Sequence, residues 1–234
     1  MKNIKKQSLL GIIVFMALFL VAGTTSMVAQ SVSCTPWDLS SNGNWQLKEG
    51  SIDYNAKGIT FTADNGKRCN PSSKTTHAVN SKSVIYYKVK ADKANLSIRD
   101  AKISIFIPNY SLNGEEGTLM IKQLRGYELG KDKSGFTWIA FDLSKLGADA
   151  KKQGVYTYEF QVKGKPKVLY TSEDDDIKIY NKILKDLKKN EYKGNRFDFI
   201  LISKLDKDQG NESFTMEELG NAESIGEVKA KINK

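Results

Sequence analysis

The stretch Ser83 to Gln161 constrains the fold most, because its apolar and polar residues alternate. The clearest run places Ile85, Tyr87 and Val89 on one side of an extended chain. A period of two over such lengths predicts half-buried strands whose apolar side chains face a core. We therefore expect an antiparallel meander of five strands, at Val84–Ala91, Leu96–Ile107, Thr118–Leu124, Phe136–Leu143 and Val155–Val162.

Shorter apolar runs on both sides of the meander extend this β pattern. Within the meander, Asn113-Gly114 is a turn signal, because both residues tolerate the positive φ of tight hairpins. No linker rich in proline or glycine separates the runs, so one domain is expected over residues 30–222. The predicted fold class is mostly β, an antiparallel, jelly-roll-like β-sandwich, with further strands at Trp45–Lys48, Ser51–Tyr54, Gly58–Thr62, Lys167–Thr171 and Phe197–Leu205.

Near the C-terminal end, the apolar spacing changes to that of a helix. From Ile177 to Leu187 apolar residues recur every three or four positions, with acids before them and lysines after them. This charge order suits the helix dipole, so one amphipathic helix is predicted over 175–189. Thr215-Met216-Glu217-Glu218 resembles a capping box and predicts a short helix, and residues 223–234 are expected to be a charged, flexible tail.

Residues 1–29 have the pattern of a signal peptide. Lys2, Lys5 and Lys6 precede the 15 residues of the apolar run Leu9–Gly23, and small residues follow. A membrane-spanning helix needs about 20 apolar residues, so cleavage and export to the periplasm, cell surface or medium are expected. A retained anchor and lipid attachment at Cys34 are the alternatives.

The charge of the mature chain is modestly positive. Removing three lysines lowers the net charge from +9 to +6. In an exported protein this charge favours a polysaccharide or cell-surface glycan, acidic ones included, or an acidic protein as partner. The alternative is that the charge only keeps the protein soluble. The lysines are spread among acids, so no nucleic-acid partner is expected. Contact with a membrane is expected only through the signal peptide.

The chain has two cysteines, Cys34 and Cys69. An even number in an exported chain predicts one disulfide between them. Such a bond would tie the loop of residues 63–82 to the N-terminal arm.

One segment weakly resembles a calcium loop. Asp206, Asp208 and Glu217 occupy positions one, three and twelve of that pattern, but Asn211 stands where the turn requires glycine. A plain acidic turn is the favoured interpretation and a structural calcium ion the alternative. No other cofactor is expected.

The residues available for catalysis are few. His77 is the one histidine, which disfavours a Ser-His-Asp or Cys-His mechanism. Glycosidase chemistry needs two carboxylates across a cleft, and spacing alone does not place Glu115, Glu116, Asp142 or Glu159. We expect a non-catalytic protein, with a polysaccharide lyase or glycosidase as the enzyme alternative.

The strand faces that point away from the core are the predicted binding surface. Aromatic rings there can stack on a sugar while polar side chains hydrogen-bond its hydroxyls. The alternative is that Trp138 packs beneath a helix or a second sheet. The candidate ligand-binding residues are Trp138, Tyr86, Lys88, Glu159, Gln161 and Asp142.

The segment Trp138-Ile139-Ala140-Phe141-Asp142-Leu143-Ser144-Lys145-Leu146 has the aromatic-x-x-x-Asp-Leu-Ser form of a strand end. With the export signal and the short strands, it resembles secreted bacterial jelly-roll domains of the galactose-binding and carbohydrate-binding-module kind. The resemblance implies a non-catalytic glycan-binding protein. A structural or interaction protein of the cell envelope is the second hypothesis, and a polysaccharide-active enzyme the third.

Overall fold

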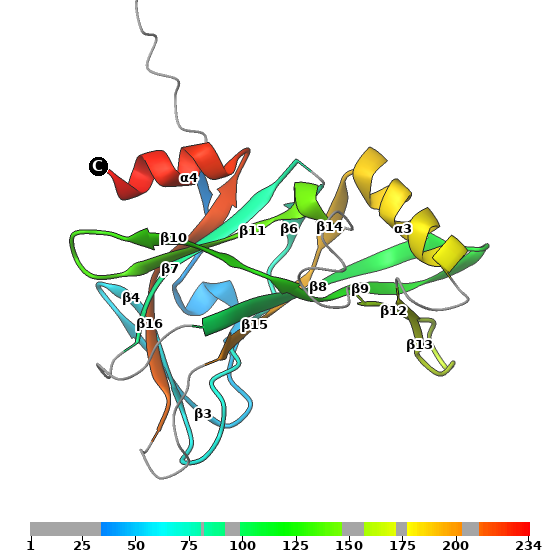
Figure 1. The fold of residues 1–234 in the computed structure, drawn as a ribbon. Helices are drawn as coiled ribbons and strands as arrows, with labels where there is room; N and C mark the ends of the chain where they lie inside the picture. The colour runs from blue at the N-terminus through cyan, green and yellow to red at the C-terminus, as the bar shows by residue number, and fades with distance from the viewer. Residues whose placement is uncertain (1–33, 81, 92–98, 147–156, 172–176, 203–210) are drawn as a thin grey trace, which may run out of the picture. The chain divides into compact units, whose positions relative to one another are not determined.

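The computed structural model of the chain describes residues 34–80, 82–91, 99–146, 157–171, 177–202 and 211–234. They form two antiparallel sheets packed face to face, a small two-stranded sheet and two α-helices (Figure 1). The mostly β, antiparallel sandwich architecture expected from the sequence is confirmed. None of the helices in the described residues has both the length and the apolar character needed to cross a bilayer.

Sheet A contains seven of the described strands. The strand β16 is central: it pairs with β7 on one side and with β4 and β1 on the other. The order is β10 (Tyr127–Lys131), β11 (Thr137–Asp142), β7 (Val84–Ala91), β16 (Ser213–Ala222), β4 (Gly58–Ala63) and β3 (Gly50–Asn55), with β1 (Thr35–Pro36) beside β16.

Sheet B also contains seven described strands, and the long β8–β9 hairpin lies at its centre. The two-residue turn of this hairpin is Asn113-Gly114, with φ of 53° and 83° as predicted. The order is β13 (Val168–Thr171), β12 (Thr157–Gln161), β9 (Glu115–Arg125), β8 (Arg99–Leu112), β15 (Arg196–Ile202), β5 (Ser72–Ser73) and β2 (Trp45–Gln46).

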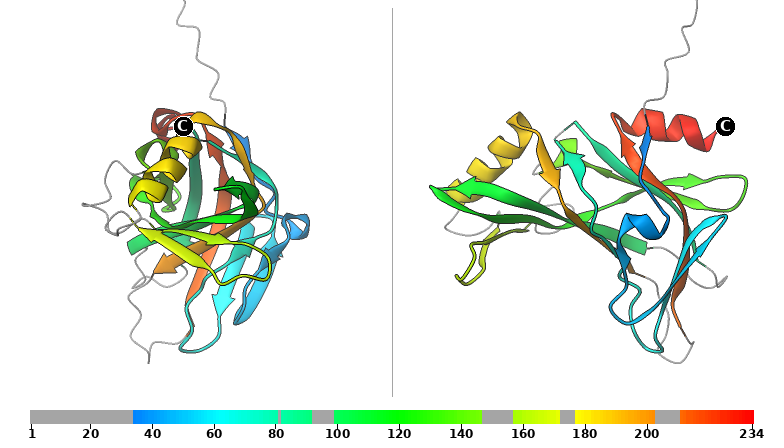
Figure 2. Two further views of the ribbon diagram at one scale, coloured as in Figure 1. Left: turned by 90° about the vertical axis from the view of Figure 1, so that its right-hand side faces the viewer. Right: turned by 180° about the vertical axis from the view of Figure 1, so that it is seen from behind.

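The main core lies between the sheets. Tyr87 of sheet A meets Phe199 of sheet B edge-on, with ring centroids 6.0 Å apart. The predicted helix is present as α3 (Ile177–Lys189), and its buried Tyr180 packs at a tilt against Tyr158, with ring centroids 4.9 Å apart. Helix α3 therefore packs on the core side of sheet B, beside β13, whereas α4 (Ile225–Ile232) lies against β10, β11 and β16 (Figure 2). The remaining elements are the sheet formed by β14 (Tyr192–Gly194) and β6 (His77–Val79), and the 3-10 helices η1 (Ser41–Gly43) and η2 (Leu143–Lys145).

The strands of the meander form as predicted, but they do not lie next to one another in one sheet. Strand β7 is in sheet A, β8 and β9 in sheet B, β11 in sheet A and β12 in sheet B. Gly126 marks the crossing from β9 to β10: a Cβ there would come within 2.6 Å of Ile139 Cγ2. Alternation predicts which side of a strand is buried, but it does not say to which sheet the strand belongs.

Two expectations for the C-terminal region are wrong. The capping-box segment 215–218 is part of β16, which has hydrogen-bonded neighbours on both sides that outweigh local helix preference. The expected flexible tail contains helix α4, whose Val228 is fully buried. Ser224 caps this helix by accepting a hydrogen bond from the Glu227 N–H at 3.3 Å.

The predicted disulfide is not formed. Cys69 lies in the main core, where its Sγ is 3.7 Å from the Phe61 carbonyl oxygen. Cys34 packs on the opposite face of sheet A, beside Tyr86. Sheet A separates the two sulfur atoms, so an even cysteine count was a poor guide here.

Candidate functional site

The predicted aromatic pair is assembled, but it is not accessible. Tyr86 of β7 and Trp138 of β11 lie on the side of sheet A away from the main core, as their alternation predicts. Their rings are nearly parallel, with centroids 5.9 Å apart. Yet Tyr86 is 0% exposed and Trp138 is 3% exposed. The alternative, in which Trp138 packs beneath a helix, is therefore the one that the structure supports.

Helix α4 covers this pair and forms a second, smaller core. We call it the Trp138 cluster and define it as Val84, Tyr86, Trp138, Ala140, Ala222 and Val228.

The polar rim of the Trp138 cluster is satisfied internally. The Tyr86 hydroxyl donates to Glu218 at 2.7 Å, and Lys231 of α4 donates to that hydroxyl at 3.2 Å. Burial and the Glu218 carboxylate raise the pKa of Tyr86. The helix is thus held by both apolar and charged contacts.

Lys88 also serves this packing. Its ammonium lies 2.8 Å from Asp132 and is paired with Glu217, and Asp132 accepts the Trp138 indole N–H at 3.2 Å. Burial alone would lower the pKa of Lys88, but the hydrogen bonds to the two carboxylates raise it. Lys88 therefore links strand β7 to its neighbours and has its charge matched locally.

The proposed calcium ligands are not brought together in the described residues. Glu217 is paired with Lys88, and Asp206 and Asp208 lie outside the part of the chain that the structure describes. Among the described residues, no group of three His, Cys, Asp or Glu side chains could hold a metal ion.

Asp142 has a capping role at the end of β11. Its carboxylate accepts the backbone N–H of Ser144 at 2.9 Å and starts η2. It also lines a hollow of about 780 Å³ at the end of sheet A, together with Asn221 and Ser224.

Glu159 and Gln161 lie on β12 of sheet B and so belong to a different surface from Tyr86 and Trp138. Glu159 is 7% exposed and is flanked by the Lys122 and Lys167 ammonium groups at 3.6 and 2.7 Å. The six predicted ligand-binding residues therefore do not form one site. Nor do Asp142 and Glu159 face each other across one described cavity.

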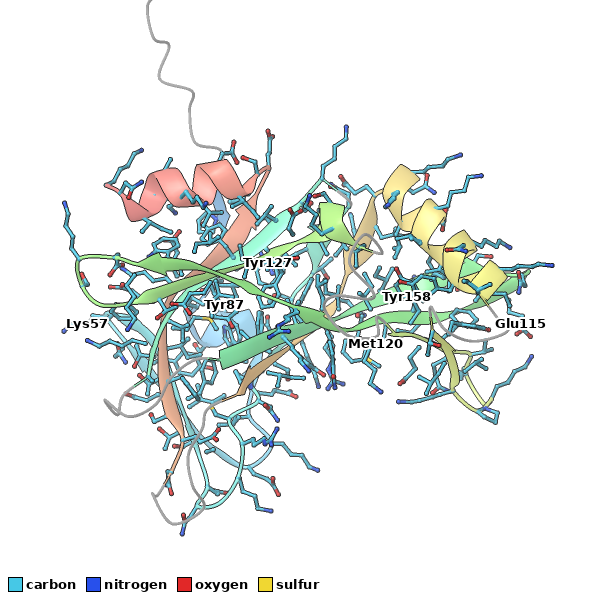
Figure 3. All side chains as sticks on the ribbon, in the orientation of Figure 1. Lys57, Tyr87, Glu115, Met120, Tyr127 and Tyr158 are labelled. Atoms are coloured by element: carbon cyan, nitrogen blue, oxygen red, sulfur yellow. The ribbon has the colours of Figure 1, made fainter. Side chains whose placement is uncertain are left out.

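The face of sheet B away from the core carries polar side chains in register. Tyr158 points toward α3, whereas Met120 lies on the other side of the sheet (Figure 3). In the described part of the chain, no helix covers this outer face. One row across the sheet, made of directly opposed residues, is Arg196, Phe106, Met120, Glu159 and Leu169.

The neighbouring row forms the floor of a groove of about 800 Å³. Gln46 opposes Ser72, Ser72 opposes Asp198, and Asp198 opposes Ser104. Directly opposed residues share a face of an antiparallel sheet, so four strands contribute to one polar line. We call this hollow the sheet-B groove and define it by Gln46, Asn70, Ser72, Ser104, Arg196 and Asp198.

Arg196 is held rigidly beside this floor. Its Nε and Nη2 donate to the two Asp198 carboxylate oxygens at 2.8 and 2.9 Å. The guanidinium also lies 4.6 Å from the centroid of the Phe106 ring. A guanidinium has five N–H donors, and Asp198 uses two of them. Asp198 therefore leaves the other donors of the guanidinium for further partners.

A β-bulge lies next to the floor. Gln123 has a φ of 54°, and its backbone N–H donates to Ser104 Oγ at 3.1 Å. The register between β8 and β9 shifts at this point. Bulges of this kind bend a sheet and redirect side chains, and they are frequent beside binding sites.

The sheet-B groove was not among the sites expected from the sequence. Phe197–Leu205 was predicted as a strand without a binding face, and residues 203–205 lie outside the described part of the chain. The signal was the alternation of Arg196, Asp198 and Ile200 with Phe197 and Phe199, which gives the strand a polar face. Residues two apart on a strand share a face, so Arg196 and Asp198 were a foreseeable pair.

No protein-family model matches the chain, and no curated protein matches its sequence. Among solved structures, the xylan-binding module CBM15 is similar, with a TM-score of 0.34 and 14% identity over 82% of this chain and 97% of that one. Xylanase10C from Cellvibrio japonicus, in complex with xylopentaose, has a TM-score of 0.29 and 14% identity over 80% of this chain and 28% of that one. The carbohydrate recognition domain of Emp47p has a TM-score of 0.29 and 12% identity over 76% of this chain and 88% of that one. The chain thus resembles a carbohydrate-binding module and a lectin domain weakly, in architecture alone.

Proposed function

We propose that this is an exported, non-catalytic glycan-binding protein whose ligand lies in the sheet-B groove. The observation that carries the proposal is the row Gln46, Ser72, Asp198 and Ser104 on the floor of an open groove. Export follows from the signal-peptide pattern of residues 1–29.

The size and lining of the groove suit a short stretch of sugar chain. Its volume of about 800 Å³ lies in the range of roughly 300–1,000 Å³ that is usual for ligand sites. Leu47, Ile52 and Ile200 supply aliphatic surface for the C–H faces of pyranose rings. The carboxylate, amide, hydroxyl and guanidinium groups of the floor accept and donate the hydrogen bonds that sugar hydroxyls need.

The rigidity of the site favours binding. Arg196 is fixed by Asp198 and by Phe106, and Ser104 is fixed by the Gln123 N–H. Groups that are already ordered lose little conformational entropy when a ligand binds. A flexible surface of the same composition would bind more weakly.

Affinity electrophoresis tests this proposal. The mature protein is run in gels that contain neutral or acidic soluble polysaccharides. We expect retardation by at least one polymer and a loss of affinity of about tenfold or more in Arg196→Ala, since one truncated anchor commonly costs that much. The control is Lys57→Ala, at the exposed β3–β4 turn, which should bind like the wild type. The absence of retardation by every polymer would refute the proposal.

A second candidate function is docking of an envelope protein at the edge of sheet B. The observation that favours it is strand β13, which lies at the edge and exposes Val168 by 44% and Leu169 by 50%. An open edge of this kind can accept a further strand. Cross-linking in the native envelope should then capture a partner that Leu169→Lys loses and Lys163→Ala keeps; a protein that captures nothing would rule this candidate out.

A further inference from the structure

We propose that the glycan held in the sheet-B groove is anionic, bearing carboxylate or sulfate groups, and that Lys48, Arg68 and Arg196 recognise its charge. This inference rests on the proposed glycan-binding function and narrows it to one class of polymer.

The carboxylates of the groove already have cationic partners. Asp198 is engaged by Arg196 through two hydrogen bonds, and Glu49 lies 3.1 Å from the Lys67 ammonium. Lys48 and Arg68 also line the groove, and within the described residues no carboxylate pairs with either of them. The groove therefore carries an excess of positive charge.

The positive charge continues along the sheet. Lys102 is directly opposite both Ile200, which lines the groove, and Arg125 of β9. An anionic polymer that runs along this face would meet these two cations as well.

The geometry of Arg196 adds specificity. A guanidinium binds planar or tetrahedral oxyanions through paired N–H groups, which a point charge such as an ammonium does not reproduce. The Phe106 ring centroid lies 4.6 Å from the guanidinium, so the ring and Asp198 together restrain this group. The site is built for an oxyanion more than for a hydroxyl.

The experiment compares matched polymers by affinity electrophoresis and by titration calorimetry. Polygalacturonate, alginate and hyaluronan are each tested beside their carboxyl-reduced forms, and dextran sulfate is tested beside dextran. We expect an anionic polymer to bind at least tenfold more tightly than its neutral counterpart. Raising NaCl from 0.05 to 0.5 M should weaken binding several-fold, because partly exposed charges are screened. The carboxylate and sulfate arms identify which oxyanion is preferred.

Three variants test the residues. Arg68→Glu and Lys48→Glu should each reduce the affinity for the anionic polymer at least tenfold, and Arg68→Lys should reduce it only slightly. Lys57→Glu makes the same change of charge away from the groove and should leave binding unchanged. Equal thermal midpoints would show that all four variants are folded.

The possible failures are distinguishable. Equal binding of an anionic polymer and its neutral form, or binding of neutral polysaccharides alone, would overturn the anionic specificity and leave the proposed function standing. Failure of every polysaccharide, neutral or anionic, would refute both. Equal affinity for single-stranded DNA, or an equal loss in Lys57→Glu, would show non-specific attraction to polyanions and overturn the inference.

Discussion

The two outer faces of the sandwich are built on the same sequence pattern but differ in what lies over them. On sheet A, Tyr86 and Trp138 are sealed beneath α4. On sheet B, Arg196, Asp198 and Ser104 line an open groove. Aromatic residues at strand positions that point away from the main core therefore form a second core, whereas polar residues at such positions line the accessible groove. An outward-facing ring is therefore evidence of a binding site only when nothing packs on it.

The largest effect on stability is expected from removal of the Trp138 ring at the centre of the closed face. Trp138→Ala should lower the free energy of unfolding by about 3–5 kcal/mol, because it leaves a cavity beneath α4. Urea denaturation measures the change, and Trp138→Phe should lose less. Polysaccharide binding by the folded variant should be retained, and an unchanged unfolding midpoint would show that the ring is not enclosed.

A smaller effect is expected from the helix that closes sheet A. Val228→Ala removes the one fully buried side chain of α4 and should lower the free energy of unfolding by about 2 kcal/mol. Lys229→Ala, on the exposed side of the same helix, should change it by no more than about 0.5 kcal/mol. Equal effects of the two substitutions would mean that α4 does not dock through Val228.

Mild acid should weaken the region between the sheets before it affects either outer face. His77 stacks on Trp37 with centroids 3.6 Å apart, and burial lowers its pKa from 6.5 to about 4. The unfolded chain therefore binds this proton more tightly, so stability should fall as the pH drops from 6.5 to about 4 and then level off for this group. Thermal midpoints at pH 7.5, 5.5 and 4.5 measure the decrease. His77→Gln should remove that component, and an identical pH profile in this variant would contradict the assignment.

Only a small effect on stability is expected at the open face. Arg196→Ala breaks an exposed ion pair and should change the free energy of unfolding by about 1 kcal/mol or less, despite its large effect on binding. Differential scanning calorimetry beside the binding assay separates the two quantities. A loss of stability as large as that of Trp138→Ala would show that the groove is a packing feature.

Much of the fold could be predicted, because alternation reports burial directly. Strand β7 has the predicted bounds, and the Asn113-Gly114 turn has the predicted positive φ values. The assignment of strands to sheets could not be predicted, since it depends on contacts such as the tight approach of Gly126 to Ile139.

The candidate site was less predictable than the fold. Ser224-x-x-Glu227 has the form of a capping box, and Ile225, Val228 and Ile232 follow at helical spacing. This overlooked signal would have indicated the helix that covers Trp138. The similar motif at Thr215 lies in a strand, so the motif alone does not decide. Prediction of the groove would have required the register of four strands, and two of these strands are only two residues long.

The crossing of the chain between sheets has a consequence for folding kinetics. Because β7, β9, β11 and β12 alternate between the two sheets, neither sheet can be completed while the other is unformed. The pairing of β1 with β16 joins residues at opposite ends of the described chain, which gives a high contact order. Proteins with many such distant pairings fold slowly, in milliseconds to seconds. The alternation of strands between the two sheets thus makes the search for the native topology, rather than the formation of any one hairpin, the slow step.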